Sequence, residues 1–138
     1  KNASQNVKKV VEKLKEDNDI RVDFHVRDYR PWGNYQILDE ENQKFKVKRI
    51  FVKPGKRLSY QMHNHRSEHW IVVRGTATVT IDGHVSDVNQ GESTFIKITQ
   101  KHRLENRTEE ELEIIEVQHG DYLEEDDIVR FEDDFDRL

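Results

Sequence analysis

The sequence predicts an all-β fold, a barrel or sandwich of short strands with one amphipathic helix ahead of it. Short segments in which apolar and polar residues alternate recur through most of the chain. Turn signals separate these segments about every ten residues, which is typical of all-β domains. One segment near the start has helical spacing instead. We expect residues 1–23 to form a helix and a linker, and residues 24–138 to form a single β domain.

The predicted helix spans residues 6–17. Its apolar residues are three and four positions apart, with lysines and glutamates between them: Val7, Val10, Val11 and Leu14. This spacing places the apolar side chains on one face of a helix. The charged residues 16–23 follow as a linker to the β domain.

The first predicted strand spans residues 45–52, where Phe45 and Val47 alternate with Lys46 and Lys48. Lysines and arginines are concentrated around this strand, whereas acidic residues dominate the last part of the chain. We interpret the lysines as a strand face that is open to solvent. Contact with an anionic small molecule is the alternative.

Further strands are predicted between turn residues. Pro54-Gly55 suits the two central positions of a type II turn, and Asp82-Gly83 is a hairpin signal. The predicted strands are residues 58–63, 69–73, 76–81, 93–98, 102–106 and 112–118.

The composition narrows the function classes. The chain of 138 residues has 33% hydrophobic and 37% charged residues and no cysteine, so disulfides, zinc fingers, iron–sulfur clusters and thiol catalysis are excluded. The net charge of −5 argues against a general nucleic-acid binder, because duplex binding relies on a basic face. No segment approaches the roughly 18 apolar residues of a membrane span. We expect a cytoplasmic protein that binds neither nucleic acid nor membranes.

Two spaced motifs carry the candidate chemistry. In the first, five residues separate Gly55 from Gln61, one separates Gln61 from His63, four separate His63 from Glu68, and six separate Glu68 from Gly75. This is the spacing of the first cupin motif, with glutamine in the first histidine position.

The second motif follows in the right order. Ten residues separate Gly91 from His102, and three more separate His102 from Asn106, as in the second cupin motif. The sequence therefore predicts a cupin, a double-stranded β-helix or jelly-roll barrel.

The spacing explains how four side chains could meet. Gln61 and His63 are two apart and leave the same strand face, and a short reversal lets Glu68 return beside them. His102 then comes from a separate strand. Two imidazoles, one amide oxygen and one carboxylate suit a borderline divalent ion such as Zn²⁺, with Mn²⁺, Co²⁺ or Fe²⁺ as alternatives. Because only the carboxylate is charged, the bound ion would remain a strong Lewis acid.

His65 offers another ligand set. His63 and His65 could supply the His-x-His pair of an ordinary four-ligand cupin, as in an iron oxygenase, but only two residues then separate His65 from Glu68. We predict the set with Gln61 and assign His65 to the surroundings of the substrate. A barrel without metal, whose histidines only satisfy polar contacts, is the remaining alternative.

Seven blocks of the chain, in order, resemble the type II phosphomannose isomerase domain. In that family the domain is usually the C-terminal half of a bifunctional mannose-1-phosphate guanylyltransferase/mannose-6-phosphate isomerase. The first block reads Arg30-Pro31-Trp32-Gly33-Asn34-Tyr35. The others are residues 45–50, 52–55, 58–59, 61–73, 102–106, and 115–118 with 122–130.

The resemblance implies reversible conversion of mannose 6-phosphate to fructose 6-phosphate through an enediol, a step that feeds GDP-mannose and polysaccharide synthesis. It also implies linkage to an N-terminal guanylyltransferase domain, which a chain of 138 residues cannot contain. A homodimer is expected from analogy with the fold alone.

Such a reaction needs a base, an electrophile and a cation for the phosphate. The metal ligands predicted above supply the electrophile. The candidates for proton transfer and catalysis are His65, Arg66, His69 and Glu116. The candidates for the phosphate are Arg66, Arg103, Lys48 and Arg130, because guanidinium groups contact phosphate oxygens in pairs.

The sequence departs from the family at several positions. Lys97 and Thr99 stand where the second motif usually has Pro-x-Gly before its histidine, and Glu124 and Asp136 stand where the tail commonly has glycine. These departures keep open a second function, a noncatalytic sugar-phosphate-binding or dimerising module attached to a guanylyltransferase.

Overall fold

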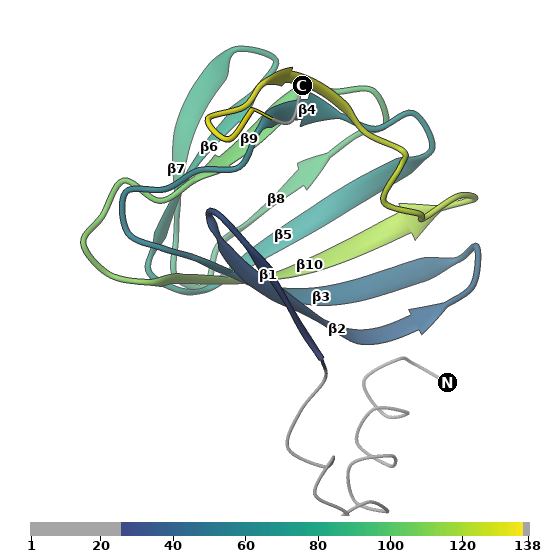
Figure 1. Ribbon diagram of the computed structural model, residues 1–138, viewed down its shortest axis with the longest axis horizontal. Coiled ribbons are helices and arrows are strands. Elements are labelled where there is room, and N and C mark those ends of the chain that lie inside the picture. The colour runs from purple at the N-terminus through teal and green to yellow at the C-terminus, as the bar shows by residue number, and fades with distance from the viewer. Residues whose placement is uncertain (1–25, 137–138) are drawn as a thin grey trace, which may run out of the picture.

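A computed structural model describes residues 26–136, and this part of the chain consists of β-strands joined by turns, without a helix (Figure 1). The predicted N-terminal helix and the domain boundary after residue 23 lie outside the described residues. No helix long and apolar enough to cross a membrane was found in the part that is described.

Eleven strands form two antiparallel sheets that face each other across the core (Figure 1). The first sheet has the order β1-β2-β3-β10-β5-β8 and the second β11-β4-β9-β6-β7. The strands are β1 (Arg27–Arg30), β2 (Gly33–Glu41), β3 (Phe45–Val52), β4 (Tyr60–Met62), β5 (Arg66–Arg74), β6 (Thr76–Ile81), β7 (His84–Asn89), β8 (Ser93–Ile96), β9 (His102–Glu105), β10 (Leu112–Gly120) and β11 (Val129–Glu132).

The predicted β pattern is confirmed for most strands. Strands β3 and β6 have the predicted bounds, and the predicted turn at Pro54-Gly55 is closed by a hydrogen bond from the Lys56 amide to the Lys53 carbonyl at 3.1 Å. Asp82-Gly83 joins β6 to β7 as a hairpin. Strands β1, β2, β7 and β11 were not predicted.

The predicted orientation of β3 is wrong. Lys46 and Lys48 point into the barrel and are 7% and 4% exposed, whereas Phe45 and Val47 lie on the outer, partly exposed face. The lysines are buried because partners meet them inside the barrel, and the Lys46 ammonium donates to the Leu123 carbonyl at 2.9 Å.

Strand β10 lies in the middle of the first sheet and shows how the interior is divided. The cross-strand row Ile50, Ile114 and Val72 is apolar and buried. The next two rows toward the other end are polar: Lys48 with Glu116 and Trp70, and Lys46 with Gln118 and Glu68. The barrel therefore has an apolar core at one end and a polar interior at the other, which is where the site lies.

The turn from β1 to β2 anchors the edge of this sheet. The Trp32 side chain is buried in the core, and the Trp32 carbonyl accepts a hydrogen bond from the Lys53 amide at 2.9 Å. At Gly33 a side chain would collide with the Phe51 carbonyl on β3. Only glycine permits this close approach of the two strands.

Candidate functional site

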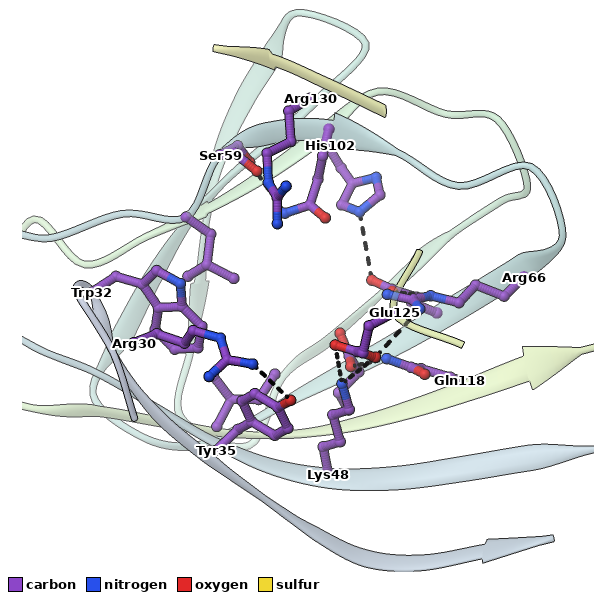
Figure 2. A pocket seen from close by; sticks show the side chains of 15 residues that line it. Arg30, Trp32, Tyr35, Lys48, Ser59, Arg66, His102, Gln118, Glu125 and Arg130 are labelled. Atoms are coloured by element: carbon purple, nitrogen blue, oxygen red, sulfur yellow. Dashed lines mark hydrogen bonds and ion pairs between the residues drawn. The ribbon is translucent and has the colours of Figure 1, made fainter. Parts of the chain in front are cut away.

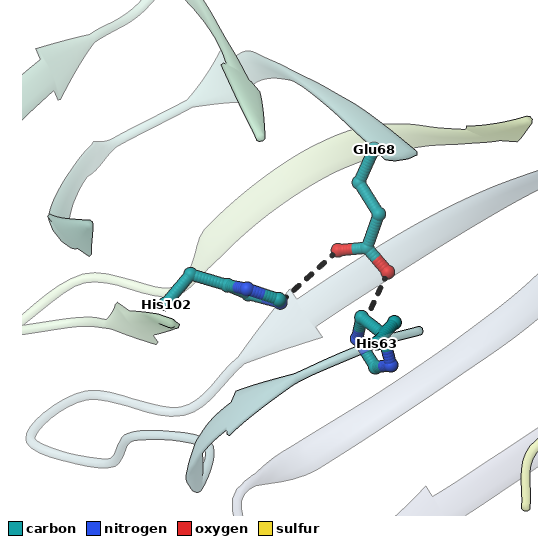
Figure 3. Close-up of side chains that lie close together, drawn as sticks. All are labelled: His63, Glu68 and His102. Atoms are coloured by element: carbon teal, nitrogen blue, oxygen red, sulfur yellow. Dashed lines mark ion pairs between the residues drawn. The ribbon is translucent and has the colours of Figure 1, made fainter. Parts of the chain in front are cut away.

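Three of the four predicted metal ligands converge in the polar end of the barrel. His63 follows β4, Glu68 lies on β5 and His102 begins β9, and each residue is only 2% exposed. One ligand atom from each lies within 4.8 Å of the others (Figure 3). Glu68 lies between the two rings, with Oε2 3.3 Å from His63 Nε2 and Oε1 3.5 Å from His102 Nε2.

Backbone carbonyls orient both imidazoles. His63 Nδ1 lies 2.6 Å from the Asp127 carbonyl, and His102 Nδ1 lies 2.8 Å from the Gln100 carbonyl. When Nδ1 donates its proton to a carbonyl, the Nε2 lone pair is left for a metal. The donor set of two imidazole nitrogens and one carboxylate thus fits a borderline divalent ion such as Zn²⁺.

Burial and neighbouring charges shift the pKa values of the three cluster residues in different directions. Burial lowers the pKa of His63 to about 4, so its ring is neutral at neutral pH. Burial also acts to raise the pKa of Glu68, but Arg66 and the two histidines outweigh it and hold this pKa well below its usual value. The pKa of His102 is raised, because its hydrogen bond with Glu68 and the charge of Glu68 outweigh burial.

Gln61 lies beside the cluster. It pairs with His102 across β4 and β9, and both residues line one pocket. Its side-chain amide donates to the Ser59 carbonyl at 3.3 Å. The role of Gln61 as a fourth ligand stays a prediction.

Arg66 is held directly by the predicted ligands. Its Nε donates to Glu68 Oε2 at 2.8 Å, and its Nη2 lies 3.2 Å from His63 Nε2. The same lone pair of His63 would bind a metal. Arg66 and a metal ion therefore compete for this nitrogen.

Two residues of the cluster, Glu68 and His102, line a pocket with mixed charge (Figure 2). Its charged lining residues are four cations and three carboxylates: Arg30, Lys48, Arg66, Arg130, Glu68, Glu116 and Glu125. Tyr35 closes one side, where its ring lies 4.3 Å from Lys48 Nζ and its hydroxyl accepts from Arg30 at 3.3 Å.

Glu116 lies on β10 at the bottom of this pocket and is buried. Its Oε2 accepts a hydrogen bond from Trp70 Nε1 at 2.9 Å, and its Oε1 accepts one from Gln118 Nε2 at 2.6 Å. Burial, reinforced by the charge of Glu68, raises the pKa of Glu116 to about 7. This carboxyl group can therefore take up or release a proton near neutral pH.

Two histidines proposed for catalysis lie outside the pocket. His69 follows Glu68 on β5 and points to the outer face, where its ring lies 5.2 Å from that of Phe95. Successive side chains of a strand point to opposite faces, so His69 points outward because Glu68 points inward. The His65 side chain is 54% exposed in the turn before β5, and its ring lies 5.8 Å from that of Tyr122.

Arg103 does not line the pocket either. It is buried, but its neighbour His102 points inward and Arg103 points the other way. Its guanidinium donates to the Leu58 carbonyl at 2.9 Å and to the side chain and carbonyl of Glu132 at 3.1 and 3.2 Å. Arg103 thus ties β9 to β11, and we withdraw it from the phosphate candidates.

Sequence reasoning missed several pocket residues. Gln118 could have been found, because it lies two positions after Glu116 on a predicted strand and shares its face. Arg30, Tyr35 and Glu125 stand in blocks that carry the family resemblance, but their local sequence assigns them no role in a site; they come from the end of β1, from β2 and from an irregular segment.

A barrel of two facing antiparallel sheets, with two histidines and a glutamate converging inside it, defines a protein of the cupin class. Solved structures with this fold include oxalate decarboxylase from Bacillus subtilis, with a TM-score of 0.69 and 18% identity over 79% of this chain and 30% of that chain. An RmlC-like cupin from Shewanella frigidimarina has a TM-score of 0.66 and 21% identity over 75% and 89% of the two chains.

The family described as mannose-6-phosphate isomerase C-terminal matches residues 16–133, and the chain belongs to this family. Mannose-1-phosphate guanylyltransferase ManC from Salmonella typhimurium is 51% identical over 138 residues, all of this chain and 28% of that protein. Alginate biosynthesis protein AlgA from Pseudomonas syringae is 52% identical over 137 residues, 99% of this chain and 28% of that protein. The chain thus spans about 28% of the length of these curated relatives.

Proposed function

We propose that this domain interconverts mannose 6-phosphate and fructose 6-phosphate through an enediol. The observation that carries the proposal is one pocket lined by Glu68 and His102 of the His63/Glu68/His102 cluster, by a buried carboxyl group with a pKa near neutrality, and by several cations. An aldose–ketose isomerase needs these three functions together.

The metal would be held by His63, Glu68 and His102, with Gln61 as the predicted fourth ligand. It would supply an electrophile that polarises the two substrate oxygens. Zn²⁺ is the first choice, with Mn²⁺, Co²⁺ or Fe²⁺ as alternatives.

Glu116 is the proposed base that moves the proton between C1 and C2. Trp70 and Gln118 each hold one of its oxygens, so the carboxyl group is fixed inside the pocket. A pKa of about 7 lets it accept the proton and return it at neutral pH. We do not retain His65 and His69 for this role, because both lie outside the pocket.

The substrate phosphate is assigned to Lys48, Arg66 and Arg130, and Arg30 joins them from the opposite side of the pocket. Arginine side chains bind phosphate oxygens in pairs, and a buried lysine adds a point charge. These cations would also exclude neutral sugars of similar size.

A coupled assay tests the reaction. The protein is loaded with Zn²⁺, Mn²⁺ or Co²⁺ and supplied with mannose 6-phosphate, and fructose 6-phosphate is measured. We expect turnover in the wild type and a loss of at least about a hundredfold in Glu116→Gln with metal content retained. Absence of turnover with all three metals would refute the proposal.

A noncatalytic binding or dimerising module is the second candidate, motivated by Lys97 and Thr99. Their turn is nevertheless closed by a hydrogen bond from the Gln100 amide to the Lys97 carbonyl at 3.1 Å, and His102 reaches the cluster. Binding of mannose 6-phosphate without turnover would select this candidate.

We further propose that the domain works in the cytoplasm, as a homodimer and linked to a guanylyltransferase, in GDP-mannose supply for polysaccharide synthesis. The names of the relatives support the guanylyltransferase and polysaccharide parts of this proposal, among them xanthan biosynthesis protein XanB from Xanthomonas campestris, 52% identical over 96% of this chain and 28% of that protein.

A further inference from the structure

The carboxylate of Glu125 lies among the cations of the pocket (Figure 2). Its two oxygens are 3.2 and 3.1 Å from Lys48 Nζ, and Oε2 is 3.9 Å from Arg66 Nη1. Lys48 and Arg66 are both buried, so each needs an opposite charge close by. Glu125, from a distant part of the sequence, provides that charge for Lys48 and adds to the charge that Glu68 provides for Arg66 at 2.8 Å.

Glu125 differs from the two other pocket carboxylates. Glu68 and Glu116 are buried on strands, whereas the Glu125 side chain is 55% exposed. It belongs to the irregular segment of residues 121–128, which we call the strap. Burial acts to raise the pKa of Glu125, but the two neighbouring cations lower it overall, so the group is ionised at neutral pH.

The strap is anchored on both sides of Glu125. Before it, the buried Leu123 accepts a hydrogen bond from Lys46 through its carbonyl. After it, the Asp127 carboxylate accepts from the Asn64 and His65 amides at 2.9 and 3.0 Å. The Glu125 side chain can therefore rotate toward solvent while the backbone of the strap remains in place.

We propose that Glu125 is an internal counter-ion of the phosphate subsite, displaced from Lys48 and Arg66 by the phosphate group of the substrate. This proposal rests on the proposed function. A phosphate brings up to two negative charges and three acceptor oxygens, more than the carboxylate that it replaces. The buried cations pass from one anion to another and are never left unpaired.

The exchange also determines specificity. A neutral sugar brings no charge with which to replace the carboxylate, so it cannot release Glu125 from the two cations. A sugar phosphate brings such a charge and can displace the carboxylate from the two cations. The two cations thus select for an anionic group, and Glu125 keeps them paired while no phosphate is bound.

Binding of inorganic phosphate to the metal-free protein tests the proposal by titration calorimetry. Glu125→Gln removes the charge and keeps the shape, and Glu124→Gln is the matched control, an exposed glutamate of the strap that does not line the pocket. We expect phosphate to bind about fivefold more tightly to Glu125→Gln, the size of effect given by a partly exposed ion pair. Glu124→Gln should bind phosphate like the wild type.

A double-mutant cycle tests whether the effect of Glu125 depends on Lys48, its ion-pair partner. In a Lys48→Met background the gain from Glu125→Gln should disappear, because the cation that the carboxylate balances is gone. Circular dichroism of each variant confirms that the barrel is folded.

Phosphate affinity that is unchanged or weaker in Glu125→Gln would overturn the proposal, as would absence of phosphate binding in both proteins. The isomerase assay separates the two proposals. Turnover by the wild type with unchanged phosphate affinity in the variant refutes only the counter-ion. Tighter phosphate binding by the variant without turnover by the wild type refutes only the isomerase.

Discussion

Glu68 and Glu116 lie in one pocket, and the Trp70 indole donates to both at 3.2 and 2.9 Å, yet their pKa values shift in opposite directions. Glu68 has Arg66 and two imidazoles around it, and these hold it ionised. Glu116 is buried and faces the charge of Glu68, and these two effects outweigh the charges of Lys48 and Arg66. Two carboxyl groups with pKa values driven apart are typical of sites that divide charge stabilisation from proton transfer.

The raised pKa of Glu116 predicts a pH dependence of stability. In the metal-free protein, the folded state binds a proton that the unfolded state releases between its usual pKa of 4.5 and about 7. Stability from this group is therefore present at pH 4.5 and is lost as the pH rises to 7, by about 3 kcal/mol at most.

Glu116→Gln should remove this dependence. Urea unfolding at pH 5 and pH 7.5 would measure the free energy of unfolding of both proteins. We expect the wild type to lose more stability than the variant between these two pH values. An equal loss in both proteins would contradict the pKa shift.

Metal content distinguishes the predicted ligands from Arg66, which contacts two of them. His63→Ala and His102→Ala each remove a nitrogen of the cluster and should lower bound Zn²⁺ to a small fraction of one equivalent, and Gln61→Ala should lower it less. Arg66→Ala should retain the metal, because it frees His63 Nε2, while the Michaelis constant for mannose 6-phosphate rises. Elemental analysis after dialysis measures the bound Zn²⁺. Full occupancy in His63→Ala, His102→Ala and Gln61→Ala would refute the assignment.

At the scale of elements, the turn of residues 97–100 keeps the shape that glycine normally allows. Thr99 has a φ of 67°, in the left-handed region where a β-branched residue is strained, and Asp136, one of the two tail positions that commonly hold glycine, has a φ of 57°. At these two positions the backbone therefore has a conformation that favours glycine, whereas Glu124 does not have a positive φ. The Thr99 amide still donates to the His63 carbonyl at 2.8 Å.

Thr99→Gly should stabilise the protein. Relief of the strained backbone gives about 1–2 kcal/mol, and the added freedom of glycine in the unfolded chain offsets about 0.5–1 kcal/mol. Ile98→Gly, in the same turn without a positive φ, is the control and should destabilise. Thermal unfolding measures both, and a lower melting temperature for Thr99→Gly would contradict the strain.

The strands with clear alternation and the three convergent ligands could be predicted, because both follow from spacing along the chain. Strand β7 could not, since five of its six residues are exposed and its pattern carries no apolar period. Alternation in β3 defined two faces but not which one turned inward, so Lys46 and Lys48 were misplaced. Asp127 acts on His63 across 64 residues, a contact that local sequence does not reveal.

At the scale of the whole molecule, apolar packing stabilises one end of the barrel, and polar groups are concentrated at the other end. The apolar residues around Ile114 pack between the sheets, while His63, Glu68 and His102 bring little apolar surface. A metal ion that binds only the folded state would therefore add stability to the end that lacks an apolar core.

Metal binding should raise the melting temperature. Free Zn²⁺ at a hundredfold excess over its dissociation constant adds about 2.7 kcal/mol, which corresponds to about 10 °C for a domain of this size. Calorimetry with and without metal measures the shift, and the double variant His63→Ala/His102→Ala is the control. The same shift in the control would place the metal elsewhere.

The position of Asp127 after the three cluster residues in the sequence affects the order in which the domain matures. During synthesis His63, Glu68 and His102 emerge well before residue 127, but His63 is oriented by the carbonyl of Asp127. The strap must leave the ribosome before the cluster is complete, so the nascent chain cannot hold metal tightly too early. We expect ribosome-bound chains ending at residue 120 to bind Zn²⁺ at least tenfold more weakly than chains ending at residue 138, when both are extended by the same linker that carries them out of the exit tunnel. Equal affinity of the two would show that the strap is not needed.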